Sequence, residues 1–467
     1  YNFDVGYDAS FKEGPLGYVN GINDSIDPST GALSYSENIC SLPGKNGLDL
    51  NLSLTYSSSS PNTAKDVDEA FNIASNWQFN VPYLTNKYGR RLDNKNSNGV
   101  KYITLESGAT YEVINTKFGY IFKNCTDSNF RYGFEVLQVD ENKSGGRDSK
   151  YLLKYNNGTT KYFDENGRWI KTKNRFGNTI TVTRNSNTEV VITDTLDRNV
   201  VIRTGDYREW QTITTPDGKV ITLNYSIVQN GSYKKRVLES KNDAIGNSTN
   251  FTYTVSINDF CKNALLIKIV FPTGLENYYE YQWINELEEF YDYETDRINQ
   301  KCAEKNGKEV LTARIGNSYM KNDGEKCKSK QYSYNGNYME ARGYFGAFCL
   351  SGSNNCELYY EPLFDRDKNN NSIVSSNNKN NWFCSWDINA YITLITENYN
   401  YTTTITDEKG VIQKYTFNQL GQNTNIWIND GGAKSKETTI EYLYDNAPTN
   451  LPTKITYREY SGTKGYD

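Results

Sequence analysis

The chain has 467 residues, a formal net charge of −5, 36% hydrophobic residues and no histidine, while aromatic residues reach 14% and include 39 Tyr. With only 10 Pro and 35 Gly, this composition excludes a collagen-like or disordered chain and favours a β-rich protein whose sheets bury amphipathic rings. The chain has no basic stripe, which argues against a nucleic-acid partner, and no apolar run near the roughly 20 residues that a membrane-spanning helix needs.

The first 60 residues predict a turn, a loop and a strongly patterned strand. Asp27–Gly31 reads as a turn that feeds a strand, and Leu42–Gly47 reads as a loop. The run that follows alternates strictly between apolar and polar residues, which is the period of a β-strand. The residues that share one face of this strand are Leu48, Leu50, Leu52, Leu54 and Tyr56.

Short β-like runs continue to about residue 150. Lys101–Leu105 and Ala109–Ile114 flank the turn Glu106–Gly108, and this arrangement predicts a hairpin. Glu141–Asp148 is a polar turn that suits a boundary. We therefore predict a first β-rich region over residues 1–150.

From residue 151 the sequence becomes a quasi-periodic series of hairpins. In Tyr162–Arg184, glycine turns alternate with runs of β-branched and aromatic residues. Gly supplies the positive φ that tight turns require, and Asp and Asn favour such turns. The turn residues that we single out are Asp164, Gly167, Gly177, Asp217, Gly218, Gly246, Gly274 and Gly410. Because Gly218, Gly246 and Gly274 are evenly spaced by 28 residues, a repeat array is predicted over 151–283.

The period is lost over 284–395 and resumes over 396–467. The segment 284–395 contains an Asn-rich tract and five of the eight cysteines, so it reads as a cysteine-containing insertion into the array. Its beginning, Asn285–Lys301, is acidic and compatible with a short helix.

The cysteines leave two interpretations open. There is no CxxC pair, and without histidine the usual zinc patterns are absent. The thiols are either buried and free, or they form disulfides that pin long loops of a secreted protein. In the second case the pair to expect is Cys349 with Cys356.

Several segments resemble one family, the RHS or YD-repeat proteins. Tyr162–Arg168, YFDENGR, resembles the YxYDxxGR unit of that family, with Phe163 in place of the inner Tyr. Thr215–Lys219 and Thr406–Gly410 resemble its T-D-x-x-G linkers. The segment that precedes the repeats in such proteins resembles Asp27–Gly31 together with the Leu42–Leu50 region.

This resemblance implies a long β-sheet ribbon that spirals into a hollow shell. In bacterial relatives the shell encloses a toxin made from the C-terminal end of the same chain. The predicted fold class is therefore all-β, with quasi-repetitive hairpins forming a long curved sheet and with irregular cysteine-bearing insertions.

The reactive residue types in the sequence argue against a catalytic site. Without histidine, Ser-His-Asp and Cys-His catalysis and His-ligated metals are excluded. Asp365–Asn371 begins like a calcium loop, but it lacks Gly at the sixth position and has Ser376 where the Glu ligand belongs. Trp382 and Trp386 are candidates for stacking on sugars, although their spacing also fits local packing. No catalytic, cofactor-binding or metal residue is predicted.

These observations predict a non-enzymatic scaffold, secreted or on a cell surface, that forms the wall of a shell. Its expected partners are its own C-terminal cargo or toxin segment, copies of itself, or a cell-surface glycan. One alternative is a surface adhesin or filament subunit that uses exposed strand edges. A second is a carbohydrate-active enzyme, which needs two carboxylates facing each other across a cleft. Tyr1 at the start and a repeat-like end predict a fragment or a processed product.

Overall fold

The structure is a computed structural model, and all its elements are strands apart from a short 3₁₀ helix, η3 (Lys45–Gly47), within the part of the chain that it describes. The described residues are 24–58, 71–86, 91–92, 99–107, 110–115, 120–122, 129–130, 136–205, 209–231, 233–255, 264–287, 289–292, 297–301, 309–336, 347–348, 357–360, 401–417, 423–430, 434–442, 452–461 and 464–466. The predicted all-β fold with a long sheet of hairpins is confirmed.

The N-terminal strands form a sheet of five, in the order β1-β2-β3-β5-β4. Its members are β1 (Asp24–Ile26), β2 (Leu33–Leu42), β3 (Leu50–Ser57), β4 (Asn72–Ala74) and β5 (Trp77–Phe79). Strand β3 follows the predicted alternation, with Leu50, Leu52, Leu54 and Tyr56 all buried. Strands β2 and β3 form a long antiparallel hairpin that runs from Leu42 opposite Leu50 to Ser34 opposite Ser57.

A second, much longer antiparallel sheet contains most of the remaining strands. Its strands are β6 (Tyr83–Thr85), β7 (Tyr102–Thr104), β8 (Thr110–Asn115), β9 (Tyr120–Phe122), β10 (Leu137–Val139), β11 (Tyr151–Lys154), β12 (Thr160–Phe163), β13 (Trp169–Lys173), β14 (Thr179–Arg184), β15 (Glu189–Thr193), β16 (Asn199–Thr204), β17 (Trp210–Thr214), β18 (Val220–Asn230), β19 (Tyr233–Asn242), β20 (Ser248–Val255), β21 (Ala264–Val270), β22 (Glu276–Leu287), β25 (Glu309–Asn322), β26 (Glu325–Gly336), β29 (Tyr401–Asp407), β30 (Ile412–Phe417), β31 (Asn423–Asn429), β32 (Lys434–Tyr442), β33 (Pro452–Ser461) and β34 (Lys464–Tyr466). The predicted hairpin around Glu106–Gly108 is the pair β7–β8, so that prediction is confirmed.

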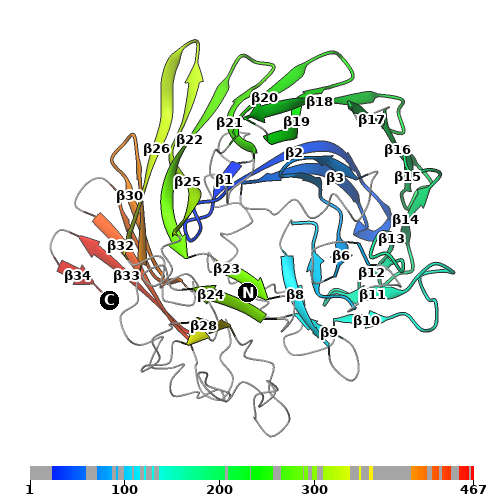
Figure 1. Cartoon of the computed structure of the whole chain (residues 1–467), viewed down its shortest axis with the longest axis horizontal. Coiled ribbons are helices and arrows are strands. Elements are labelled where there is room, and N and C mark those ends of the chain that lie inside the picture. The colour runs from blue at the N-terminus through cyan, green and yellow to red at the C-terminus, as the bar shows by residue number, and fades with distance from the viewer. Residues whose placement is uncertain are drawn as a thin grey trace, which may run out of the picture.

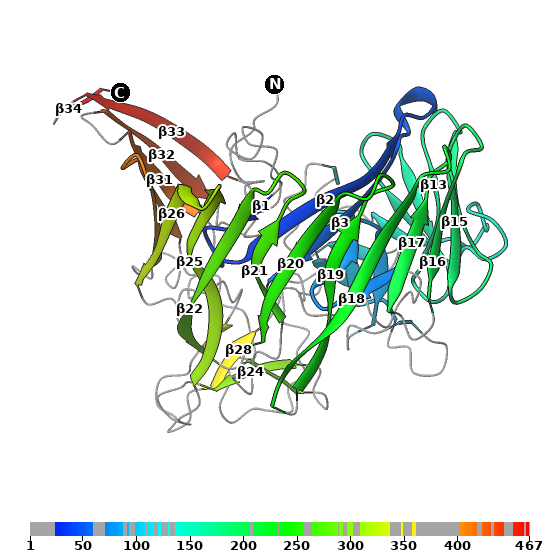
Figure 2. The ribbon, with the colours of Figure 1, turned by 90° about the horizontal axis from the view of Figure 1, so that it is seen from above.

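The long sheet curves around the N-terminal sheet. Figure 1 shows its strands as an arc, with β2 and β3 on the concave side, and Figure 2 shows the strands from β15 to β22 side by side in front of the N-terminal hairpin. The apolar faces of the two sheets form one buried cluster that extends from Leu33 in β2 to Tyr332 in β26. Alternation along strands such as β15 and β16 supplies this face, since Val190, Ile192 and Ile202 point into the cluster.

The beginning of the long sheet turns back onto a later part of it. Tyr83 in β6 forms a bridge with Arg168, and the Leu84 amide donates to the carbonyl oxygen of Gly167 (2.9 Å). The first strand of the sheet therefore contacts the turn between β12 and β13.

The segment after residue 284 differs from the sequence-based expectation. The predicted helix at Asn285–Lys301 is wrong, because β22 continues to Leu287 and is followed by β23 (Glu289–Asp292) and β24 (Arg297–Lys301). Acidic composition alone does not distinguish a helix from a strand, and this stretch also carries aromatic and β-branched residues that suit a strand.

Two further strands of the segment 284–395 belong to the long sheet. Strand β25 pairs with β22, and β26 pairs with β25 and then with β29. A separate sheet of four strands, β23-β24-β28-β27, includes β27 (Ala347–Phe348) and β28 (Glu357–Tyr360).

Candidate functional site

A recurring turn joins neighbouring strands of the long sheet and contains the residues that the sequence singled out. In its example at 164–168, the Asp164 amide donates to the carbonyl oxygen of Arg168 (2.9 Å), and the Gly167 amide donates to that of Asp164 (3.1 Å). Gly167 has φ +82°, a left-handed conformation that favours glycine. The same two backbone bonds form in the turns 155–159, 174–178, 194–198, 215–219, 243–247, 271–275 and 407–411.

The aspartates of these turns are occupied by the turns themselves. The Asp194 carboxylate accepts bonds from the amides of Leu196 and Arg198 (both 2.9 Å) and from Arg198 Nε (2.7 Å). Burial disfavours its charge, but these bonds outweigh burial and lower the pKa of Asp194. At the exposed Asp217, bonds from Lys219 and Thr215 lower the pKa to about 2. The carboxylates of Asp194 and Asp217 are therefore structural acceptors and stay ionised at neutral pH.

The turns divide between the two edges of the sheet, because consecutive antiparallel strands reverse direction. The turn 194–198 and those that contain Gly177, Gly218, Gly246, Gly274 and Gly410 lie on one edge, which we call the repeat-turn edge. A Cβ atom at any of these glycines has nothing within 4 Å. The turn of Gly167 lies on the opposite edge, where a Cβ atom meets the Leu84 carbonyl oxygen at 2.4 Å.

Each of the three glycines that are spaced by 28 residues is followed, seven residues later, by a tyrosine. These tyrosines are Tyr225, Tyr253 and Tyr281. Each of these tyrosines stands at a shift in strand register, where the ladder bends. Their side chains reach back to the preceding strand. Tyr253 donates to the carbonyl oxygen of Leu238 (2.8 Å), and Tyr281 donates to that of Leu266 (3.0 Å).

Burial raises the pKa of each of these three tyrosines and keeps its hydroxyl protonated. Sequence reasoning found the glycines and missed the tyrosines. The signal was present, since an aromatic residue recurs at the same distance after each glycine of the series.

Replacing Tyr253 by Phe is expected to lower the free energy of unfolding by about 1–2 kcal/mol, because it leaves two buried groups unsatisfied. These are the carbonyl of Leu238 and the Trp77 indole N–H, which donates to the tyrosine hydroxyl at 2.7 Å. Urea unfolding measures the loss. The matched change Tyr457→Phe, at a side chain that is 62% exposed, should leave stability within about 0.5 kcal/mol. Equal effects of the two changes would contradict a role of the buried hydroxyl.

The lead-in turn at 27–31 is shaped by its own side chains. The Asp27 carboxylate accepts bonds from the Ser29 amide and the Thr30 hydroxyl (both 2.8 Å), and the Gly31 amide donates to the Asp27 carbonyl oxygen (2.7 Å). Gly31 has φ +66°. The sequence Asp-Pro-Ser-Thr-Gly therefore forms a rigid loop with its carbonyl groups turned outward.

Those carbonyl groups bind strands that lie far along the chain. The Ile315 amide in β25 donates to the Gly31 carbonyl oxygen (3.0 Å), and the buried Thr403 hydroxyl in β29 donates to that of Pro28 (2.6 Å). The start of the N-terminal hairpin is thus fixed to the later part of the long sheet.

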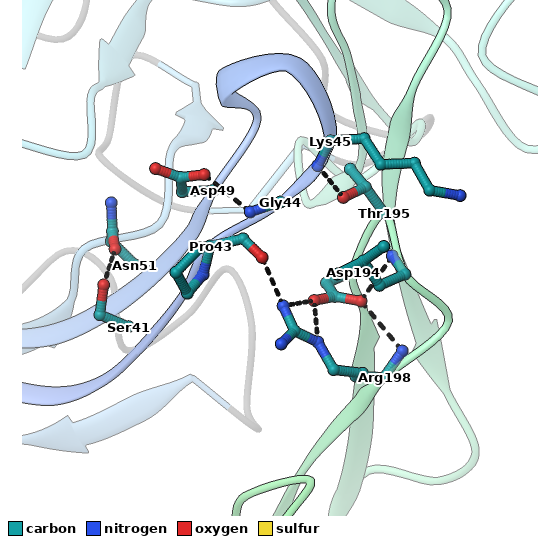
Figure 3. A network of polar contacts seen from close by, with 10 residues as sticks. Ser41, Pro43, Gly44, Lys45, Asp49, Asn51, Asp194, Thr195 and Arg198 are labelled. Atoms are coloured by element: carbon teal, nitrogen blue, oxygen red, sulfur yellow. Dashed lines mark hydrogen bonds and ion pairs between the residues drawn. The ribbon is translucent and has the colours of Figure 1, made fainter.

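The other end of the hairpin is fixed to an earlier part of the sheet (Figure 3). The Lys45 amide donates to the Thr195 hydroxyl (2.7 Å), and Arg198 Nη2 donates to the Pro43 carbonyl oxygen (2.6 Å). Asp49 accepts a bond from the Gly44 amide (2.7 Å) and holds the tip in shape. Because it is held at both ends across the concave face, we call the β2–β3 hairpin with its end loops 27–32 and 43–49 the brace.

A further carboxylate organises the loop between β10 and β11. Asp140 is buried and accepts bonds from the Ser144 amide (2.9 Å) and hydroxyl (2.7 Å), the Gly145 amide (2.9 Å) and the Ser149 hydroxyl (2.5 Å). Burial opposes its ionisation, but these bonds outweigh burial and lower the pKa of Asp140 to about 2.

The stability of the protein should therefore fall in acid, in part through Asp140. Its folded pKa lies below the value of about 3.9 for unfolded aspartate, so the stabilisation is present above about pH 4 and is lost as the pH falls through about 2. Urea midpoints of the wild type and Asp140→Asn should differ clearly near pH 6 and less near pH 3. A difference that stays constant between these pH values would show that Asp140 contributes no pH dependence.

Several predicted features lie outside the described residues, namely Cys349, Cys356, Trp382, Trp386 and Asp365–Asn371. Where the structure is described, Cys40 and Cys327 carry free thiols. The same part of the chain contains no cluster of three or more Cys, Asp or Glu side chains suited to a metal ion. Nor do these residues include a helix long and apolar enough to cross a membrane.

No family model and no curated protein matches the chain. Among solved structures, the chain is similar to TcdB2-TccC3-TEV, with 11% identity and a TM-score of 0.16 over 89% of this chain and 22% of that one. A porin-like protein from Bacteroides uniformis ATCC 8492 aligns with 12% identity and a TM-score of 0.19, over 65% of this chain and 87% of the other.

The Tc holotoxin pore of Photorhabdus luminescens aligns with 10% identity and a TM-score of 0.12, over 92% of this chain and 32% of that one. The chain therefore spans about a fifth of the first of these structures and about a third of the last. These TM-scores are too low to assign a family or a function.

Proposed function

We propose that the chain is part of the wall of an extracellular, non-enzymatic scaffold of the YD-repeat type, which encloses a C-terminal segment of its own parent protein. The observation that supports this most directly is the long antiparallel sheet that curves around the brace, with the same glycine turn repeated along it. A sheet of this kind has the geometry of a wall, because it adds strands at its end while its concave face stays on one side.

The chemistry of the repeated residues fits the same proposal. The turn carboxylate of Asp194 holds backbone amides, and Tyr253 and Tyr281 tie β20 and β22 to the strand before each of them. These contacts are local, within one turn or between neighbouring strands, so further strands can be added without a new fold.

Electron microscopy of the purified full-length parent protein, combined with mass spectrometry of its chain ends, tests this proposal. Isolated hollow particles that retain a cleaved C-terminal piece are the expected result. Particles without a lumen, or a parent protein that never retains such a piece, would refute enclosure.

The repeat-turn edge favours one second candidate, assembly of copies into filaments. Three turns on this edge expose a large apolar side chain at the third position, Phe176 at 58%, Leu196 at 44% and Ile245 at 82% exposure. The turn geometry does not require an apolar residue there, and exposed apolar side chains on one edge suit contact with another copy. Regular fibres that disappear when all three are changed to Ser would support this candidate, and a monomer at high concentration would remove it.

A further inference from the structure

Lys161 occupies a position that normally belongs to the core. In the ladder of β11, β12 and β13 it stands opposite Leu153 on one side and Thr172 on the other, and both of these neighbours are buried. Its own side chain is only 14% exposed. A lysine in such a row is uncommon, because the ammonium group loses its hydration there.

The partner of this lysine comes from a different hairpin. Lys161 Nζ contacts Oε1 of Glu106, which follows β7 in the turn toward β8. The Tyr155 hydroxyl donates to the other carboxylate oxygen, Oε2, at 3.1 Å. The carboxyl group is therefore held from one side while its other oxygen faces the amine.

Aromatic rings enclose one side of this cluster. The Lys161 Nζ lies 5.3 Å from the centre of the Tyr155 ring, which packs against Phe130 at 4.8 Å, and Phe130 packs against Phe122 at 5.0 Å. Burial lowers the pKa of Lys161 to about 7, so a substantial share of the amine is uncharged at neutral pH. The Glu106 side chain is 29% exposed, and transfer of the ammonium proton to its carboxylate yields the reactive pair of a neutral amine and a neutral acid.

We propose that Lys161 and Glu106 join in an intramolecular amide bond. The lone pair of Nζ attacks Cδ of the protonated Glu106 carboxyl group, the Nζ–Cδ bond forms, and the Cδ–Oε1 bond breaks. The departing hydroxyl takes a proton from the attacking nitrogen and leaves as water, so the step needs no oxidant or other reactant. Tyr155 is the positioning residue, because its hydroxyl stays bonded to the oxygen that remains in the amide.

Two features of the fold promote this reaction. Lys161 is fixed in the paired strand β12, Tyr155 holds the Glu106 carboxyl group, and a nucleophile held against its target reacts as if it were at very high concentration. Desolvation also activates a lysine as a nucleophile. The bond would tie the β7–β8 turn to β12, next to the place where the beginning of the long sheet contacts Gly167. The amide bond can form whether or not the chain is part of a shell wall.

Mass spectrometry of the purified full chain tests the bond directly. The wild type should weigh less than its sequence by one water molecule, and proteolysis should yield the peptides of Lys161 and Glu106 as one linked species. Lys161→Arg, which keeps the positive charge but forms no such amide, should have its full sequence mass. A wild type that keeps its full mass after long incubation near pH 6, where the pair still holds the proton that the step requires, would overturn the proposal if the two peptides are recovered separately. So would a loss of water that maps to any other pair.

The role of Tyr155 has its own measurement. In Tyr155→Phe, cross-linking should be roughly 100-fold slower after refolding, as expected when one donor to a developing oxyanion is removed. The readout is the fraction of linked peptide against time, which a purely structural role in a folded chain does not change. Linking at the wild-type rate would exclude Tyr155 from the reaction.

Discussion

Replacing Gly31 by Ala is expected to lower the free energy of unfolding by more than about 3 kcal/mol, because backbone strain and a buried clash act together. The residue has φ +66°, and an added Cβ atom lies 2.6 Å from the Tyr334 hydroxyl oxygen and 2.7 Å from Arg314 Cβ. Arg314 has only 1% of its surface exposed and has no room to move aside. The turn at 27–31 would be forced off β25, and the contact of Pro28 with β29 would weaken with it.

The matched control is Gly47→Ala at the opposite end of the brace. Gly47 has φ +73°, but a Cβ atom there has nothing within 4 Å, so only backbone strain of about 1 kcal/mol is expected. Urea unfolding followed by tryptophan fluorescence compares the two variants. If both lose the same stability, the loss at Gly31 reflects its φ angle alone and the docking of the lead-in turn contributes little.

Gly167→Ala is the second change with a large expected effect, again more than about 3 kcal/mol. The added Cβ atom would lie 2.4 Å from the Leu84 carbonyl oxygen. Because this oxygen is part of the backbone, a change of side-chain rotamer cannot relieve the clash. The change therefore separates the beginning of the long sheet from the β12–β13 turn, in addition to straining the turn itself.

Gly177→Ala measures the effect of backbone strain alone. This glycine occupies the same place in the next turn and has φ +87°, with no atom within 4 Å of an added Cβ. We expect a loss of about 1 kcal/mol there. Hydrogen exchange adds a second readout, because the Leu84 amide should lose protection in Gly167→Ala and keep it in Gly177→Ala. Unchanged protection of Leu84 in both variants would contradict the contact.

The sequence predicted well what depends on neighbouring residues. The alternation from Leu48 to Tyr56 specifies which side chains of β3 are buried, and the turn glycines specify where strands reverse, because both follow from local periodicity and backbone freedom. Asn285–Lys301 was misassigned because its acidic residues say little about whether it forms a strand or a helix.

What the sequence did not predict are contacts between distant segments. Nothing in Asp27–Gly31 indicates that Ile315 and Thr403 bind its carbonyl groups. Every residue has a backbone carbonyl, so the residue types do not show which carbonyl accepts a distant hydrogen bond. Lys161 was missed for a related reason. A lysine in an alternating strand is read as a solvent-facing residue, and only the paired strands show that it shares a face with Leu153.

The docking of the lead-in turn has a consequence for the order in which the protein is made. The hydrogen bond between Pro28 and Thr403 joins residues 375 positions apart. At the usual pace of about 5–20 residues per second, a ribosome needs roughly 20 to 75 seconds to synthesise the chain between them. During that interval the apolar rows of β2 and β3 have been made but lack the strands that later bind their first loop. We therefore expect the nascent chain to depend on a holding chaperone, and slow translation should increase aggregation more than it does for a protein of local contacts.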